Sequence, residues 1–221
     1  MAGLNHVGPG SAPLLVPLSP TVTMTKLSVG GPMDNNAYLL QARGGDTVLI
    51  DAANDRRRLL DLIGSEPLDV IVTTHRHPDH WQALAAVATR TGARLVAGGP
   101  DADAIEREAK VGGIERVWDG DQIPLGDEQL SVLGLVGHTP GSITLVYGGG
   151  SAPHLFTGDS LFPGGPGKTN FEDDFTSLMD DLESKVFAAF GDDAVVHPGH
   201  GDDTTLGAER PHLAEWRRRG W

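Results

Sequence analysis

Thr74-His75-Arg76-His77-Pro78-Asp79-His80 places four metal-binding side chains within six residues. Three imidazoles and one carboxylate held this close together indicate that a divalent cation lies between them. Imidazole nitrogen suits zinc and iron, and an aspartate adds a harder oxygen ligand. The alternative is a solvated polar loop. We interpret the stretch as a metal site.

The residues around this stretch predict where it lies in the fold. Val70–Thr73 is apolar and β-branched, which is typical of a buried strand. His75 and His77 follow at a spacing of two, which directs both imidazoles to one side of an extended backbone. Asp79 lies at the start of a predicted helix over Trp81–Thr91, as capping and helix-dipole preferences favour. The sequence therefore predicts a metal-binding loop between a strand and a helix.

Three later segments repeat the same arrangement of a His or Asp just after an apolar run. Each has a glycine beside it, which allows tight turning and close backbone approach. They are Gly137–Ser142 (GHTPGS), Phe156–Ser160 (FTGDS) and Val195–Gly201 (VVHPGHG). Sites in α/β proteins are assembled at the carboxyl ends of strands, so we expect these segments to meet the first one.

Four motifs in this order, THRHPDH, GHTPGS, TGDSLF and HPGHG, resemble those of the metallo-β-lactamase fold superfamily of hydrolases, and most closely its glyoxalase II-like branch. They extend from Thr74 to Gly201. Upstream, Asn35–Leu40 and Val48–Asp51 resemble the family's opening strands. The resemblance implies an αββα sandwich, in which two mixed sheets lie face to face with helices outside and the metal site along one edge.

The resemblance also implies a binuclear centre in which no ligand position is missing. The first metal takes His75, His77 and His138, the second takes Asp79, His80 and His200, and Asp159 bridges the two. Zinc is the first expectation for both metals, with iron or manganese as alternatives. A hydroxide between the metals is expected to attack a carbonyl carbon, and Asp79 and Asp159 to orient it and carry its proton.

The expected reaction is hydrolysis of a thioester, such as an S-2-hydroxyacyl conjugate of a small thiol. Glyoxalase II has a C-terminal helical domain that helps to bind the glutathione thioester, whereas only 21 residues follow His200 here. We therefore expect a short form with an open thiol specificity. A persulfide dioxygenase with one iron is the main alternative. A lactonase or β-lactamase, and a non-catalytic binding protein, are further ones.

Composition narrows the class of protein. No apolar run approaches the 18 residues of a membrane span, and the N-terminus lacks the pattern of a signal peptide. The chain has no cysteine, which disfavours the β-lactamase subclasses with a Cys ligand and favours the cytoplasm. A formal net charge of −13 argues against a nucleic-acid substrate, because phosphate backbones require a basic face. We expect a small-molecule substrate, and the oligomeric state stays open.

Other candidate motifs give weaker evidence for a function. Phe162 replaces the glycine that a phosphate-binding loop ending at Lys168 or a G-x-S-x-G elbow around Ser160 requires. Lys168 is either a contact for an anionic substrate group or a solvent-facing side chain. Arg217–Arg219 complement a helix dipole. We expect the remaining histidines to lie outside the metal site, with His197 structural; these are His6, His154, His197 and His212. Trp216 and Trp221 are expected to pack within the chain.

We expect one domain over residues 21–221, preceded by a loose arm over residues 1–20. The predicted strands are Thr21–Ser28, Ala37–Gln41, Thr47–Asp51, Val70–Thr73, Arg94–Ala97, Gln129–Leu135, Ser142–Tyr147, His154–Thr157 and Ala194–His197. The predicted helices are Arg56–Ile63, Trp81–Thr91, Asp101–Lys110, Phe175–Phe190 and Ala208–Arg219.

Overall fold

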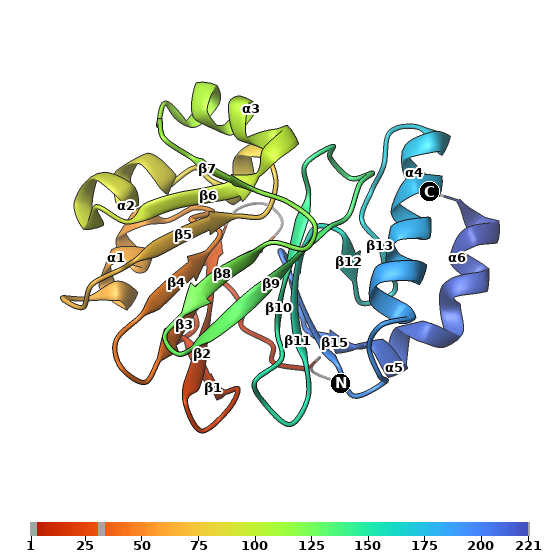
Figure 1. Ribbon diagram of the computed structural model, residues 1–221, viewed down its shortest axis with the longest axis horizontal. Helices are drawn as coiled ribbons and strands as arrows, with labels where there is room; N and C mark the ends of the chain where they lie inside the picture. Colours follow the sequence, from red (N-terminus) through yellow and green to blue (C-terminus); the bar gives the residue numbers. More distant parts are fainter. Residues whose placement is uncertain (1–3, 31–33, 221) are drawn as a thin grey trace.

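Two β-sheets lie face to face in the computed structural model, which describes residues 4–30 and 34–220 (Figure 1). The first sheet has the order β1 (Leu14–Pro17), β2 (Val22–Gly30), β3 (Asn35–Ala42), β4 (Thr47–Ile50), β5 (Val70–Thr73), β6 (Arg94–Gly98) and β7 (Glu115–Val117). The second has the order β15 (Thr204–Thr205), β14 (Val195–Pro198), β11 (His154–Gly158), β10 (Ile143–Tyr147), β9 (Glu128–Gly134) and β8 (Gln122–Leu125). A short pair, β12 (Leu161–Phe162) and β13 (Gly165–Pro166), lies beside the second sheet.

The main core lies between the two sheets. Met24 and Tyr38 from the first sheet pack in one cluster with Leu145 and Phe156 from the second, and all four are buried. β5, in the middle of the first sheet, is covered on both faces, so Val70–Thr73 is fully buried and mostly apolar. Each large apolar side chain buried in this way stabilises the fold by about 1.5–3 kcal/mol.

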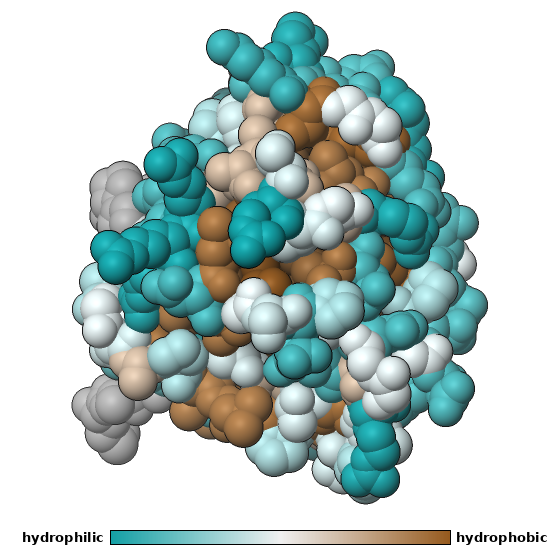
Figure 2. Space-filling view, turned by 90° about the vertical axis from the view of Figure 1, so that its left-hand side faces the viewer, coloured by the Kyte–Doolittle hydropathy of each residue, from teal (hydrophilic) through white to brown (hydrophobic). Residues whose placement is uncertain are grey.

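Helices cover the outer face of each sheet. The first sheet is covered by α1 (Arg56–Ile63), α2 (Leu84–Thr91) and α3 (Gly99–Ala109), and the second by α4 (Glu172–Asp181), α5 (Leu206–Glu209) and α6 (Leu213–Arg219) (Figure 1). On the side with α1 and α2, hydrophilic residues surround hydrophobic ones that are exposed near the centre and at the lower left of the view (Figure 2). The αββα sandwich predicted from the resemblance is confirmed. No described helix has the length and apolar character needed to cross a membrane.

Parallel pairing brings the predicted metal-binding segments to one edge. β4, β5 and β6 run parallel to one another, and β11 runs parallel to β14. The loops after β5, β11 and β14 therefore all leave from carboxyl ends of strands, and the turn between β9 and β10 joins them there. This is the edge at which a site was expected.

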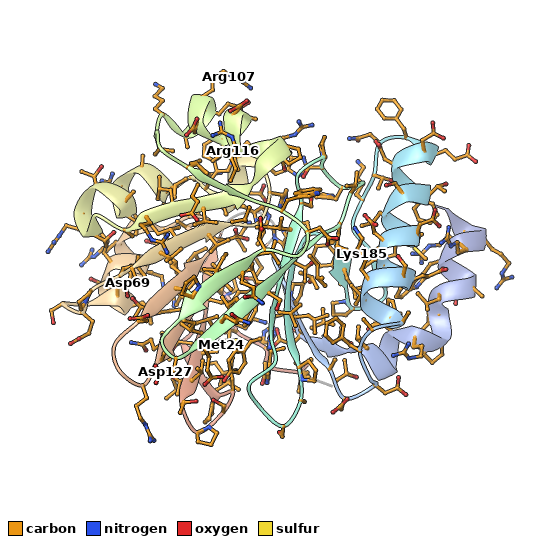
Figure 3. The ribbon with its side chains drawn as sticks, viewed as in Figure 1. Met24, Asp69, Arg107, Arg116, Asp127 and Lys185 are labelled. Carbon is orange, nitrogen blue, oxygen red and sulfur yellow. The ribbon has the colours of Figure 1, made fainter. Side chains whose placement is uncertain are left out.

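Several helices differ from their predicted bounds. Pro78–His80 forms a 3₁₀ turn, so α2 begins at Leu84 instead of Trp81. The predicted helix Phe175–Phe190 is α4 followed by a π-helical segment, Leu182–Phe187. Lys185 of that segment, labelled in Figure 3, lies beside the second sheet. Its Nζ donates to the Gly134 carbonyl of β9. Pro211 interrupts the predicted C-terminal helix, because proline lacks the N–H that a helix interior needs.

The strands that the sequence did not predict are short or lie at the edges of sheets. β7 and β8 are edge strands, and Pro124 in β8 explains why its sequence gave a weak signal. The arm over residues 1–20 is predicted to be loose, yet Leu14–Pro17 pairs antiparallel with β2. Leu4 also forms a bridge with Asp203.

Candidate metal centre

Seven side chains gather where the carboxyl ends of the strands meet. These are the seven predicted ligands His75, His77, Asp79, His80, His138, Asp159 and His200. They form three overlapping groups of possible ligand atoms, and within each group every atom lies within 4.8 Å of the others. The groups are His75–His77–His138, His75–His80–Asp159 and Asp79–His80–His200.

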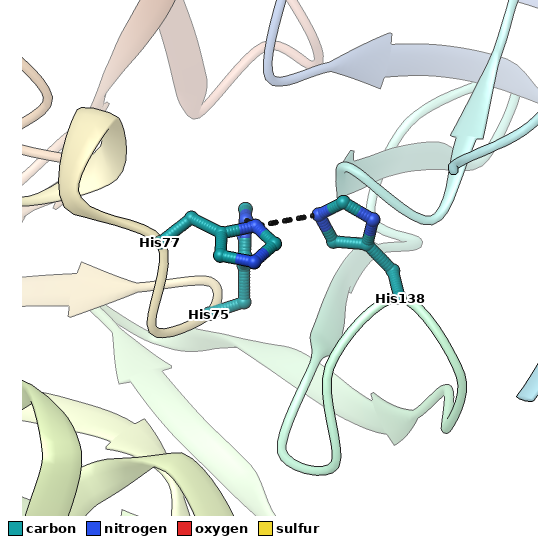
Figure 4. Close-up of side chains that lie close together, drawn as sticks. All are labelled: His75, His77 and His138. Atoms are coloured by element: carbon teal, nitrogen blue, oxygen red, sulfur yellow. Dashed lines mark hydrogen bonds between the residues drawn. The ribbon is translucent and has the colours of Figure 1, made fainter. Parts of the chain in front are cut away.

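The first group consists of three imidazoles from two loops (Figure 4). His77 Nδ1 lies 3.1 Å from His75 Nε2 and 2.9 Å from His138 Nε2. The other nitrogen of His138, Nδ1, donates to the Lys168 carbonyl at 2.7 Å, and this hydrogen bond fixes the orientation of the ring. His75 Nδ1 similarly contacts Thr74 Oγ1 at 3.1 Å. His75 Nε2, His77 Nδ1 and His138 Nε2 therefore lie close together between the two loops.

Burial makes these three imidazoles good donors of lone pairs. It lowers the pKa of His75, His77 and His138, and the nearby histidines add to the effect. A lowered pKa keeps the rings neutral at neutral pH, and a neutral imidazole is the form that binds a metal ion.

The group Asp79–His80–His200, called the second group from here on, combines histidines with a carboxylate. His200 Nε2 lies 3.4 Å from Asp79 Oδ2 and 3.3 Å from Asp159 Oδ2. His80 Nε2 lies 3.3 Å from Asp159 Oδ1, and His138 Nε2 of the first group lies 3.7 Å from Asp159 Oδ2. Asp159 thus stands between the two groups and can contact both.

Opposite charges determine the protonation of the second group. Burial opposes the charge on His200, but Asp159 and Asp79 raise its pKa to about 9. Burial likewise opposes charge on His80, yet Asp51 and Asp159 raise its pKa overall. Asp79 has a lowered pKa, chiefly because of His200. Burial raises the pKa of Asp159, but His80 and His200 together outweigh burial. The pKa of Asp159 therefore lies well below its usual value. Both carboxylates are therefore ionised at neutral pH.

Two buried atoms of this cluster, His80 Nε2 and Asp159 Oδ1, lie 3.3 Å apart without a hydrogen bond between them. Within the described ranges, neither His80 Nε2 nor Asp159 Oδ1 has a hydrogen-bond partner, although both are buried. An unsatisfied buried polar atom costs about 1–3 kcal/mol, so proteins rarely leave one without a reason. A cation between the two atoms satisfies both. The nitrogen and oxygen donors, their number and their separation all fit divalent metal ions.

Two residues that support the ligands lie outside the predicted set. Asp51 follows β4 and accepts hydrogen bonds at 2.8 Å from His80 Nδ1, Thr74 N and Thr74 Oγ1. It adopts φ 59°, a left-handed conformation unusual for a non-glycine residue. Asn35 donates to the Asp79 carboxylate at 3.1 Å. Partners of this kind orient metal ligands. The sequence signal for Asp51 was its place at the end of the predicted strand Thr47–Asp51.

A pocket of about 480 Å³ opens onto the cluster. Five of the seven predicted ligands line it, namely His77, Asp79, His138, Asp159 and His200. Phe162 and Pro166 of the β12–β13 pair form an apolar wall, and Lys168 lies at the exposed side. His75 and His80 lie deeper and are fully buried. The volume suits a small substrate.

The residues expected outside the site lie elsewhere. His197 is buried and its Nδ1 donates to Asp203 at 2.7 Å, which agrees with the structural role predicted for it. His6 contacts Asp202, and His212 is exposed near Glu215. Trp216 is buried against Phe187, as expected, whereas Trp221 lies outside the described residues.

The chain belongs to the metallo-beta-lactamase superfamily, whose model matches residues 30–200. A hydroxyacylglutathione hydrolase of Anaeromyxobacter dehalogenans is 34% identical over 169 residues, which are 76% of this chain and 61% of that protein. The chain thus spans less than two thirds of the length of that relative. A hydroxyacylglutathione hydrolase (GloC) of Haemophilus influenzae is 28% identical over 79% of this chain and 89% of its own length.

Solved structures show the same fold. The crystal structure of TTHA1623 in a di-iron-bound form has a TM-score of 0.68 and 27% identity. The match covers 82% of this chain and 95% of that one. The chain therefore shares its architecture with a protein that holds two irons.

Proposed function

We propose that this chain is a metal-dependent hydrolase of thioesters, with a hydroxyacyl conjugate of a small thiol as its substrate. The observation that carries the proposal is the set of seven nitrogen and oxygen donors, complete and gathered around one pocket. Two curated relatives with the name hydroxyacylglutathione hydrolase support the reaction class.

In this proposal the three-histidine group His75, His77 and His138 would hold one divalent metal. Asp79, His80 and His200 would hold a second, and Asp159 could serve as a ligand of either. Zinc is our first choice, and iron is supported by the di-iron neighbour. A metal pair would supply a hydroxide nucleophile near neutral pH and would stabilise negative charge on the carbonyl oxygen.

The chain's own residues bind and orient the substrate. Asp79 and Asp159 are ionised and face the pocket, so each can accept the proton of the nucleophile and pass it to the departing thiolate. Phe162 and Pro166 exclude water from one side of the reacting carbonyl. We infer that Lys168 contacts an anionic group on the thiol portion; its position at the exposed side of the pocket supports this role.

Metal analysis paired with a substrate panel tests the proposal. We expect two metal ions per chain, and turnover of an S-2-hydroxyacyl thioester above that of a lactone or a β-lactam. His77→Ala and Asp159→Ala should each lower metal content and reduce kcat/KM by more than about 100-fold, since each removes a ligand. His212→Ala, at an exposed site, is the control.

Two results would overturn the proposal. Full activity in His77→Ala or Asp159→Ala would remove these side chains from the reaction. One iron per chain, together with oxygen consumption on a glutathione persulfide, would instead identify the dioxygenase that the motifs also allow.

A further inference from the structure

A buried carboxylate outside the ligand set joins the two loops that carry the three-histidine group. Asp101 is the third residue of α3, and its side chain is completely inaccessible to solvent. A buried carboxylate is costly unless hydrogen bonds compensate it. The partners of Asp101 therefore indicate what it does.

Every hydrogen bond of the Asp101 side chain within the described ranges goes to one of these two loops. Oδ2 accepts from the backbone N–H of Arg76 at 3.0 Å and from Thr139 Oγ1 at 2.5 Å. Oδ1 accepts from the backbone N–H of Gly141 at 3.0 Å and lies 3.8 Å from Arg76 Nε. Bonds to an ionised acceptor are roughly twice as strong as neutral ones.

These partners lie directly beside the histidines. Arg76 stands between His75 and His77, while Thr139 and Gly141 closely follow His138. The two loops belong to different sheets, so their separation depends on contacts made across the interface between the sheets. The carboxylate of Asp101 is one such contact, together with the backbone bond from Ile143 N to Thr74 O at 3.0 Å.

Close backbone packing keeps this contact rigid. A Cβ added to Gly141 would lie 2.4 Å from the backbone nitrogen of Asp101, and one added to Gly98 would lie 2.1 Å from the Gly141 carbonyl oxygen. The turn that carries His138 therefore rests directly on the first turn of α3. Three donors, Arg76 N, Thr139 Oγ1 and Gly141 N, converge on the Asp101 carboxylate at the N-terminal end of α3, where a negative charge is favoured.

We propose that Asp101 is a positioning residue that sets the spacing of His75, His77 and His138, and so controls the metal affinity of this group separately from the second group. The inference rests on the proposed metal centre. None of the hydrogen bonds that Asp101 makes reaches Asp79, His80 or His200, so the second metal position does not depend on it directly.

Metal titration of Asp101→Asn tests the proposal. The amide presents an NH₂ group to N–H or O–H donors, so at least one bond to the loops is lost. We expect the affinity of one metal position to fall about 10–100-fold while the other is unchanged, since loss of such a support typically has this effect. Competition with a chromophoric chelator measures both affinities. Cobalt(II) substitution adds an absorption spectrum that reports the geometry of each position.

Two further variants make the result specific. Asp103→Asn lies on the same helix with a side chain that is 80% exposed, and it should leave both affinities unchanged. Asn35→Ala removes the donor to Asp79. It should therefore lower the metal affinity of the second position and change the cobalt(II) absorption band of that position. If Asp101→Asn does not fold, Thr139→Val removes a single donor and should shift the same position in the same direction by a smaller factor.

The outcomes separate this inference from the proposed function. Unchanged affinities in Asp101→Asn, or equal losses at both positions, overturn the positioning role alone. A wild-type protein that binds no metal tightly overturns the proposed metal centre itself. The inference is supported if Asp101→Asn loses metal affinity only at the position that Asn35→Ala leaves unchanged.

Discussion

Two clusters of histidines lie at different places in this chain. The five histidines of the proposed centre belong to the groups of possible ligand atoms at the pocket. His197 lies outside these groups and donates to Asp203, and His154 stacks on it with Nδ1 2.9 Å from His197 Nε2. Burial, with the help of His197, lowers the pKa of His154 to about 4. Adjacent histidines on neighbouring strands thus serve a structural network away from the metals.

The shift at His154 predicts a pH dependence of stability. Its folded pKa of about 4 lies below the unfolded value of 6.5, so the unfolded chain binds more protons as the pH falls between these values. His154 therefore contributes stability above pH 6.5 that is lost toward pH 4. His154→Asn keeps a donor for His197 without titrating, so it should make stability less dependent on pH.

Urea unfolding of the metal-free proteins at pH values of about 7, 5.5 and 4.5 measures this difference. His212→Asn, at an exposed position, should follow the wild type. Parallel curves for the wild type and His154→Asn would contradict the prediction.

At the scale of elements, the centre depends on how closely strand ends approach one another. The β14 loop meets the β11 loop through a bond from Gly199 N to Gly158 O at 2.8 Å. A Cβ on Gly199 would lie 2.4 Å from Asp159 Oδ1 and 2.6 Å from His80 Cε1. The absence of a side chain at Gly199 therefore lets His200 approach Asp159 and His80.

Gly199→Ala should accordingly separate Asp159 from His80. We expect metal affinity to fall by at least about 10-fold, as for other disturbances around metal ligands, and stability to fall by about 1–3 kcal/mol from overpacking. Isothermal titration with zinc and thermal unfolding measure the two effects. Gly112→Ala has no atom within 4 Å of the new methyl group and is the matched control. Normal zinc affinity in Gly199→Ala would show that the loops move apart freely.

At the scale of the whole molecule, polar contacts as well as the apolar core join the two sheets. Lys26 of β2 is fully buried, and its Nζ donates to Asp203 Oδ1 at 2.7 Å and to the Gly201 carbonyl at 2.8 Å. Tyr38 of β3 donates to the Pro198 carbonyl at 2.6 Å. These donors from the first sheet hold the turn of the second sheet that carries His200.

Lys26→Met should therefore destabilise the fold by about 3–5 kcal/mol, because it leaves the buried charge of Asp203 without its cationic partner. Chemical denaturation gives the free energy of unfolding, and zinc titration shows whether the His200 turn is displaced as well. The same substitution at the exposed Lys110 should change stability by no more than about 0.5 kcal/mol. A similarly small loss in Lys26→Met would mean that the pair contributes little to joining the sheets.

The sequence predicted the features that have short-range signals. Val70–Thr73 has the apolar pattern of a buried strand, and it is one. The motifs indicated which strand ends carry ligand-type side chains. Edge strands such as β8 and the pairing of Leu14–Pro17 with β2 escaped prediction, because their formation depends on a neighbouring strand more than on their own residues.

The family, the αββα architecture and the seven candidate ligands could be predicted from the sequence, because those side chains lie in compact motifs next to strands. The groups that support these ligands became evident only once the tertiary structure was known. Asp51, Asn35 and Asp101 lie 23 to 44 residues from the partners named above, and aspartate and asparagine are common on surfaces. Their roles depend on hydrogen bonds across the fold, and such bonds exist only once the two sheets have packed together.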